Sequence, residues 1–96
     1  MQSLSAILSL ILKNKPGLQK KYPIKTIGVF GSVTRGDFSE NSDVDILVEF
    51  DQPIGIEFID LANELESILQ QKVDLISRSG IKPKYFKMIE KDLHYV

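Results

Sequence analysis

Two short apolar runs with strand-like composition enclose the most informative part of this chain. Residues 24–30 read IKTIGVF, a run rich in β-branched and aromatic side chains that Gly31 ends. Residues 44–50 read VDILVEF and alternate in polarity, as expected for a second strand. No helix-length connection separates the two runs, so the strands are expected to be antiparallel or joined by an irregular segment.

Two aspartates stand at the start of the second run. Asp43 and Asp45 are two positions apart, so on a strand they project from the same face at a spacing of roughly 6.5 Å. Carboxylates in this arrangement can hold divalent ions, and two ions about 4 Å apart promote in-line displacement at phosphorus. A D-x-D pair alone is more often a solvated strand edge, so this pair gains meaning only from its neighbours.

A complementary signal lies at the end of the first run. Gly31 lets the backbone approach a phosphate, and free N–H groups at the start of a following helix attract anions, with the Ser32 hydroxyl as a further donor. The spacing of these parts predicts a nucleotide site. Arg35 is the only cation between Gly31 and Asp45. It could contact a triphosphate, or it could neutralise Asp37 or a site carboxylate.

Composition narrows the chemistry. The chain has no cysteine and a single histidine, His94, which excludes disulfides, thiolate zinc sites and the usual hydrolase triads. Carboxylates are therefore the only plausible metal ligands. Residues 36–71 contain ten acids and no lysine or arginine, while six basic residues lie on each side of this stretch. An acidic middle suits metal binding, and basic flanks suit a polyphosphate or a charged partner.

Helical spacing of apolar residues predicts three further elements. The first is a helix over residues 3–13 that ends at Pro16 and Gly17. The second covers about residues 58–70, with its acids expected to be solvated, and the third follows Pro83. A short helix or turn is expected directly after Ser32, followed by a polar turn at residues 39–42.

A third strand is predicted over residues 72–77, directly after the second helix. A strand, a crossover helix and a strand form a parallel unit that can place Asp74 beside Asp43 and Asp45. Asp74 would then complete a metal-binding triad and could act as a general base towards an attacking hydroxyl. The alternative is a charge at a strand edge.

These elements predict an α+β fold, a small mixed β-sheet with helices packed on it, as one domain over residues 1–96. The terminal His94 and Tyr95 are expected to contact another part of the molecule or a partner. No apolar stretch is long enough to span a membrane and no signal peptide pattern is present, so a cytoplasmic protein is expected.

The segment GSVTRGDFSENSDVDILV resembles the minimal nucleotidyltransferases (MNT) of the DNA polymerase beta-like superfamily. The signature of that family is Gly-Ser, ten residues, then D-x-D, which Gly31, Ser32, Asp43 and Asp45 match with the correct spacing. The Arg-Gly pair at Arg35 and the strand KVDLIS are also similar to the family. One departure is Thr34, where alanine is common.

The resemblance implies a polymerase beta palm-like core and a specific activity. Short proteins of this kind resemble the antitoxin of HEPN-MNT toxin-antitoxin systems, which implies transfer of AMP from ATP to a tyrosine of a HEPN toxin. Asp43, Asp45 and Asp74 would then hold two Mg²⁺ ions, and Gly31, Ser32 and Arg35 would bind the nucleotide. A partner protein would complete the acceptor side, because the chain has no room for a second domain.

Two other functions stay open from the sequence. The chain could be a catalytically idle antitoxin that neutralises its toxin by binding alone. It could instead transfer nucleotides to a small molecule or an RNA end. Direct binding of nucleic acid is not expected, because basic and aromatic residues are not interleaved as in a single-strand binder.

Overall fold

A computed structural model describes residues 3–36 and 42–96 of the chain. In chain order the elements are α1 (Leu4–Lys21), β1 (Ile24–Phe30), α2 (Ser32–Arg35), β2 (Val44–Phe50), α3 (Glu57–Leu69), β3 (Val73–Ser77), the 3₁₀ turn η1 (Arg78–Gly80), α4 (Pro83–Glu90) and β4 (His94–Tyr95). The strand order in the sheet is β3-β2-β1-β4. β1 is antiparallel to both neighbours, and β2 and β3 are parallel, which confirms the predicted α+β fold with a mixed sheet.

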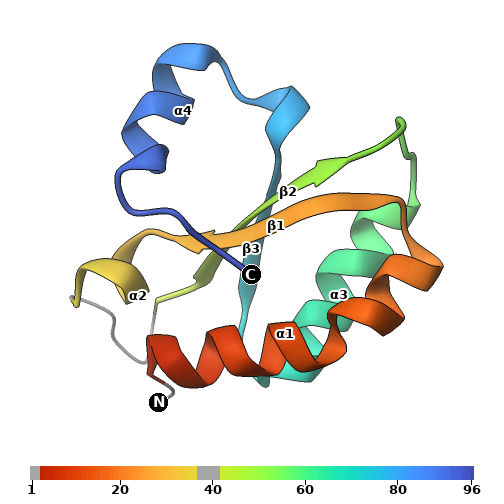
Figure 1. Ribbon diagram of the computed structural model, residues 1–96, viewed down its shortest axis with the longest axis horizontal. Coiled ribbons are helices and arrows are strands. Elements are labelled where there is room, and N and C mark those ends of the chain that lie inside the picture. Colours follow the sequence, from red (N-terminus) through yellow and green to blue (C-terminus); the bar gives the residue numbers. More distant parts are fainter. Residues whose placement is uncertain (1–2, 37–41) are drawn as a thin grey trace.

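The main core lies between the sheet and the helices α1 and α3. Figure 1 shows these two helices side by side below the strands, with α4 on the other side. The fully buried side chains come from both helices and both central strands: Ile7, Ile11, Leu18, Ile27, Val29, Val44, Ile46, Val48, Leu61, Leu65 and Leu69. The alternation of β2 is as predicted. Val44, Ile46 and Val48 face the core, and the sequence pattern places them on the face of the strand that does not carry Asp45.

The crossover from β2 through α3 to β3 forms as the sequence predicted. Helix α3 presents Leu61, Leu65 and Leu69 to the core at helical spacing, and none of the three is exposed to solvent. The helix covers the sheet, so the chain can return for a parallel strand. The resulting register pairs Asp45 of β2 with Asp74 of β3.

The predicted end of the first helix is wrong. Helix α1 does not stop near Lys13 but continues through Pro16 to Lys21. A proline inside a helix removes one hydrogen bond and costs roughly 3 kcal/mol. Leu18 and Tyr22, only 2% and 8% exposed, offset this cost, because burial of each large apolar side chain contributes about 1.5–3 kcal/mol. Local helix signals could not reveal that later packing.

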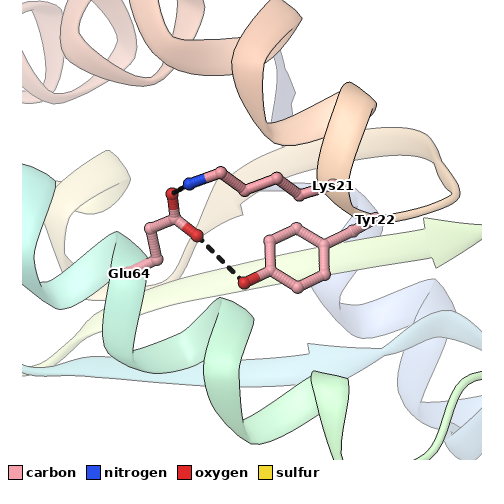
Figure 2. A network of polar contacts seen from close by, with 3 residues as sticks. All are labelled: Lys21, Tyr22 and Glu64. Carbon is pink, nitrogen blue, oxygen red and sulfur yellow. Dashed lines mark hydrogen bonds and ion pairs between the residues drawn. The ribbon is translucent and has the colours of Figure 1, made fainter.

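The acids of α3 are not all solvated, contrary to the prediction. Figure 2 shows Glu64 between Lys21, the last residue of α1, and Tyr22, which directly follows that helix. Lys21 Nζ lies 2.6 Å from Glu64 Oε1, and the Tyr22 hydroxyl donates to Glu64 Oε2 at 2.9 Å. The hydrogen bond from Lys21 lowers the pKa of Glu64, whereas burial and then Glu64 raise the pKa of Tyr22 to about 12. This network joins α1 to α3.

The C-terminal residues return to the sheet as a short edge strand. β4 pairs with β1, with Tyr95 opposite Gly28, and the Val96 N–H donates to the Ile27 carbonyl at 2.8 Å. The Lys15 ammonium also donates to the Val96 carbonyl at 2.7 Å. The expected contacts of the terminal residues are therefore made with the chain's own sheet.

No helix within the described ranges is both long enough and apolar enough to cross a membrane.

Candidate functional site

The site begins at the turn that ends β1. Gly31 adopts φ 84° and ψ −151°, a backbone conformation that is essentially restricted to glycine. A Cβ atom at this position would overlap Oδ2 of Asp45 and lie 3.0 Å from its Cγ. The turn therefore needs glycine both for its backbone angles and for the space that the Asp45 carboxylate occupies. This contact brings together the two halves of the sequence motif.

The short helix α2 starts directly after this turn, as predicted. The Gly31 carbonyl accepts from the Thr34 N–H at 3.0 Å and from the Thr34 hydroxyl at 2.8 Å. Gly36, in the left-handed region, ends the helix and donates its N–H to the Ser32 carbonyl. The threonine that departs from the family pattern thus makes one additional hydrogen bond to the turn. N–H groups in a first helical turn have no intrahelical acceptor, which suits an anion.

The three predicted carboxylates come from neighbouring positions of the sheet. Asp45 lies opposite Phe30 of β1 on one side and opposite Asp74 of β3 on the other. Asp43 is exposed immediately before β2, Asp45 is partly buried, and Asp74 is exposed. The strand register therefore places Asp74 beside Asp45, as the crossover predicted.

The charges of the neighbouring acids act on Asp45. Burial, followed by the charges of Asp74 and Asp43, raises the pKa of Asp45 to about 6, although the charge of Arg35 opposes this shift. A partly buried carboxylate next to two others is destabilised in its charged form. A bound cation would remove that penalty, so this part of the molecule favours positive charge.

The donor set fits Mg²⁺ only as a partial shell. Within residues 3–36 and 42–96, no three Asp, Glu, His or Cys side chains already form a cluster that could hold a metal ion. Magnesium prefers hard oxygen ligands and is commonly held by one or two carboxylates, with water and substrate phosphates completing the shell. Asp45 with Asp43 or Asp74 meets that requirement, provided that a nucleotide supplies the remaining oxygens.

Arg35 has a partner that the sequence did not indicate. Its Nη1 lies 3.0 Å from Oδ2 of Asp92, a residue that follows α4. Asp37, one of the predicted partners, lies outside the described residues, as do residues 39–41 of the polar turn predicted at residues 39–42. Arg35 and Asp92 are 57 residues apart in the chain, so no local sequence pattern could have linked them.

Cavity size does not identify this site. A cavity of about 700 Å³ lies at the far end of β2, where it is lined by residues such as Glu49, Phe50, Phe58 and Arg78. None of the predicted nucleotide-binding residues lines it. A glycine with positive φ beside a partly buried carboxylate of raised pKa is a more specific signal of phosphate and metal chemistry, so we place the candidate site at Gly31 and Asp45.

Comparison with known proteins shows the family of this chain. A family model described as the nucleotidyltransferase domain matches residues 12–96. The protein adenylyltransferase MntA of Thermococcus cleftensis is 39% identical over 97 residues, covering 100% of this chain and 98% of that protein.

Two solved structures share the fold. One, described as a minimal nucleotidyltransferase, has a TM-score of 0.74 at 27% identity and covers 92% of this chain and 93% of its own. The other is a toxin-antitoxin crystal structure with AMP-PNP, with a TM-score of 0.69 at 27% identity, covering 93% of this chain and 68% of that one.

Proposed function

The chain belongs to the nucleotidyltransferase domain family, and from this premise we propose that it transfers AMP from ATP to a hydroxyl group of a partner protein. The observation that carries the proposal is the direct approach of Gly31 to the Asp45 carboxylate, with Asp74 on the adjacent strand. The relative MntA is named a protein adenylyltransferase, and a structural neighbour was crystallised with AMP-PNP, which supports both the protein acceptor and the nucleotide.

The described residues suggest a division of roles. Gly31 and Ser32 would bind the outer phosphates, and Asp43, Asp45 and Asp74 would form the carboxylate set for two Mg²⁺ ions. Magnesium, when bound, would neutralise negative charge on the phosphates. Arg35 would add a positive charge on the same side. The chemistry rests on positioning and charge neutralisation and needs no covalent intermediate.

The transfer itself can be written with all bonds balanced. The acceptor oxygen forms a bond to the α-phosphorus of ATP, while the bond from that phosphorus to the β-phosphate oxygen breaks and releases pyrophosphate. Asp74 would accept the proton of the attacking hydroxyl. Its exposed position would allow a group from outside the chain to reach it.

We further propose that the acceptor is a tyrosine of a HEPN-type toxin and that the chain acts as its antitoxin. One structural neighbour is a toxin-antitoxin complex, which supports a partner of this kind. The side chains of Asp43 and Asp74 are exposed, so a second protein could present the acceptor hydroxyl to them. The partner would then complete a site that this short chain builds only on the nucleotide side.

Mass spectrometry of a co-expressed partner tests the proposal. The wild-type chain should add AMP to the partner, and the double variant Asp43→Ala with Asp45→Ala should lower the rate by at least about a hundredfold. Asp51→Ala, an exposed acid just after β2, is the matched control and should leave the rate unchanged. Unchanged transfer by the double variant would show that these aspartates do not carry the reaction.

The double variant and the purified wild-type chain separate the other two possible functions. If the double variant still neutralises the toxin although no AMP is added, the chain acts by contact alone. If the purified wild-type chain modifies a small molecule or an RNA end without any partner, the acceptor is not a protein.

A further inference from the structure

We propose that Asp92 is a positioning residue that aims the Arg35 guanidinium at the triphosphate, so that the segment after α4 forms part of the nucleotide site. This inference rests on the proposed function. It concerns a residue outside the sequence motif and gives a role to a segment that has no chemical signature of its own.

The first observation is the contact itself. Arg35 Nη1 and Asp92 Oδ2 are 3.0 Å apart, within range of a charge-assisted hydrogen bond. The Asp92 side chain is 28% exposed and that of Arg35 is 51% exposed. A pair as open as this contributes little to stability, because water screens the attraction. Its effect on the direction of the arginine side chain is therefore the more important one.

The second observation is the location of Arg35. It is the last residue of α2, the helix that begins directly after Gly31, and its N–H donates to the Gly31 carbonyl at 3.3 Å. Its positive charge is also felt by Asp45. The guanidinium carries five N–H donors in a planar fork, and the contact with Asp92 is made by one of its nitrogens, Nη1. Arginine is well suited to bind phosphate oxygens through such a fork.

The third observation is that Asp92 is itself held in place from both sides. Its own N–H donates to the Ile89 carbonyl of α4 at 3.0 Å. On its other side the chain enters β4, which pairs with β1, and Figure 1 shows this segment crossing back from α4 towards β1.

The segment is also packed closely against the sheet. A Cβ atom on Gly28 would lie 2.9 Å from Leu93 Cδ1 and 3.1 Å from the His94 carbonyl oxygen, so this segment is in close contact with β1. Asp92 therefore presents its carboxylate from a fixed backbone. A long, flexible arginine side chain loses less entropy on binding when such a partner already orients it.

A double-mutant cycle on ATP affinity tests the inference. The variants are Arg35→Ala, Asp92→Asn and the two combined, each titrated with ATP and Mg²⁺ in a calorimeter. Asp92→Asn should weaken ATP binding by about fivefold, and Arg35→Ala should weaken it by more. Because Asp92 acts through Arg35, the combined variant should bind ATP as Arg35→Ala alone does.

Two further variants separate positioning from charge and from structure. Asp92→Glu keeps the carboxylate and should retain most of the affinity. Glu90→Gln removes the same charge from an exposed position two residues away and should bind ATP as the wild type does. A structural role for Asp92 would instead lower the melting temperature without making the effect depend on Arg35.

The outcomes distinguish this inference from the proposed function. If wild-type protein does not bind ATP, both are wrong. If it binds ATP but Asp92→Asn behaves as Glu90→Gln does, or if the losses in the combined variant multiply, only the role of Asp92 is wrong.

Discussion

At Gly31 the requirement for glycine has two separate physical causes. Its positive φ excludes other residues energetically, and the Asp45 carboxylate excludes a Cβ atom sterically. At Asp45, partial burial and two neighbouring carboxylates favour the protonated form. Glycine meets both requirements at position 31, whereas the charged form of Asp45 is disfavoured, which is common where a bound ligand supplies the compensating charge.

Replacement of Gly31 by alanine should damage both stability and binding. We expect Gly31→Ala to lower the free energy of unfolding by about 1–3 kcal/mol and to abolish measurable ATP affinity, because Asp45 must move. The matched control is Gly17→Ala in α1, where no heavy atom lies within 4 Å of the added Cβ. Alanine should stabilise that helix by about 0.5–1 kcal/mol. If Gly31→Ala and Gly17→Ala changed the free energy of unfolding in urea equally, this explanation of Gly31 would be wrong.

The raised pKa of Asp45 predicts a specific pH dependence of stability in metal-free protein. The folded pKa of about 6 exceeds the ordinary value of 3.8 for aspartate, so the folded state binds the proton more tightly than the unfolded state. The associated stabilisation is complete below about pH 4 and is lost as the pH rises through 6. The free energy of unfolding of Asp45→Asn should therefore not fall in this way as the pH rises.

Urea denaturation between pH 4 and 7.5 measures the effect. Wild-type protein should lose about 1–2 kcal/mol relative to Asp45→Asn across this range, less than the full pKa shift implies, since the side chain is only partly buried. Asp51→Asn, an exposed acid, is the control and should follow the wild type. Parallel curves for wild type and Asp45→Asn would show that this aspartate does not titrate as proposed.

Among the elements, α1 and α3 are connected by polar contacts as well as by the core. Helix α1 extends past Pro16 to place Tyr22 against Glu64, and the Tyr22 hydroxyl and Lys21 ammonium share that carboxylate. The network lies on the helices, and none of its members belongs to the candidate site. We therefore assign it a structural role.

The Tyr22 hydroxyl can be removed without changing the core. Tyr22→Phe should lower the free energy of unfolding by about 1 kcal/mol through loss of the hydrogen bond to Glu64, while ATP affinity stays unchanged. Tyr85→Phe is the matched control. The Tyr85 side chain is 58% exposed, so removal of its hydroxyl should not change the free energy of unfolding measurably. Thermal unfolding and ATP titration of both variants would check this assignment, which a loss of ATP affinity in Tyr22→Phe would refute.

On the scale of the whole molecule, one core supports every part of the site. The buried side chains of α1, α3, β1 and β2 form a single cluster, and the carboxylates project from the strands that this cluster holds in register. A change in the centre of the core should therefore affect the entire fold cooperatively.

Leu65 in α3 tests this dependence, because none of its side chain is exposed. Leu65→Ala should lower the free energy of unfolding by about 2–5 kcal/mol, with one cooperative transition in urea. Leu12→Ala truncates a side chain that is 60% exposed and should change stability by less than about 0.5 kcal/mol. Two separate transitions in Leu65→Ala would mean that the site and the core unfold independently.

The sequence by itself determined the elements whose signals are local. The spacing from Gly31 to Asp45 indicates a nucleotide site, which stays a prediction. The alternation of residues 44–50 predicted β2, and the leucines of α3 predicted its buried face. Each of these signals depends on residues within one or two turns or on one strand, where backbone periodicity relates sequence directly to geometry.

Only the tertiary structure decided the features that depend on distant residues. The burial of Leu18 and Tyr22 outweighs the proline signal, the approach of the Asp45 carboxylate explains why position 31 cannot carry a Cβ, and the path of β4 brings Asp92 to Arg35. Contacts between residues far apart in the chain leave no periodic pattern, because they depend on how complete elements pack together. Local sequence patterns thus identify the side chains that carry the chemistry, and the packing of complete elements determines how those side chains are oriented.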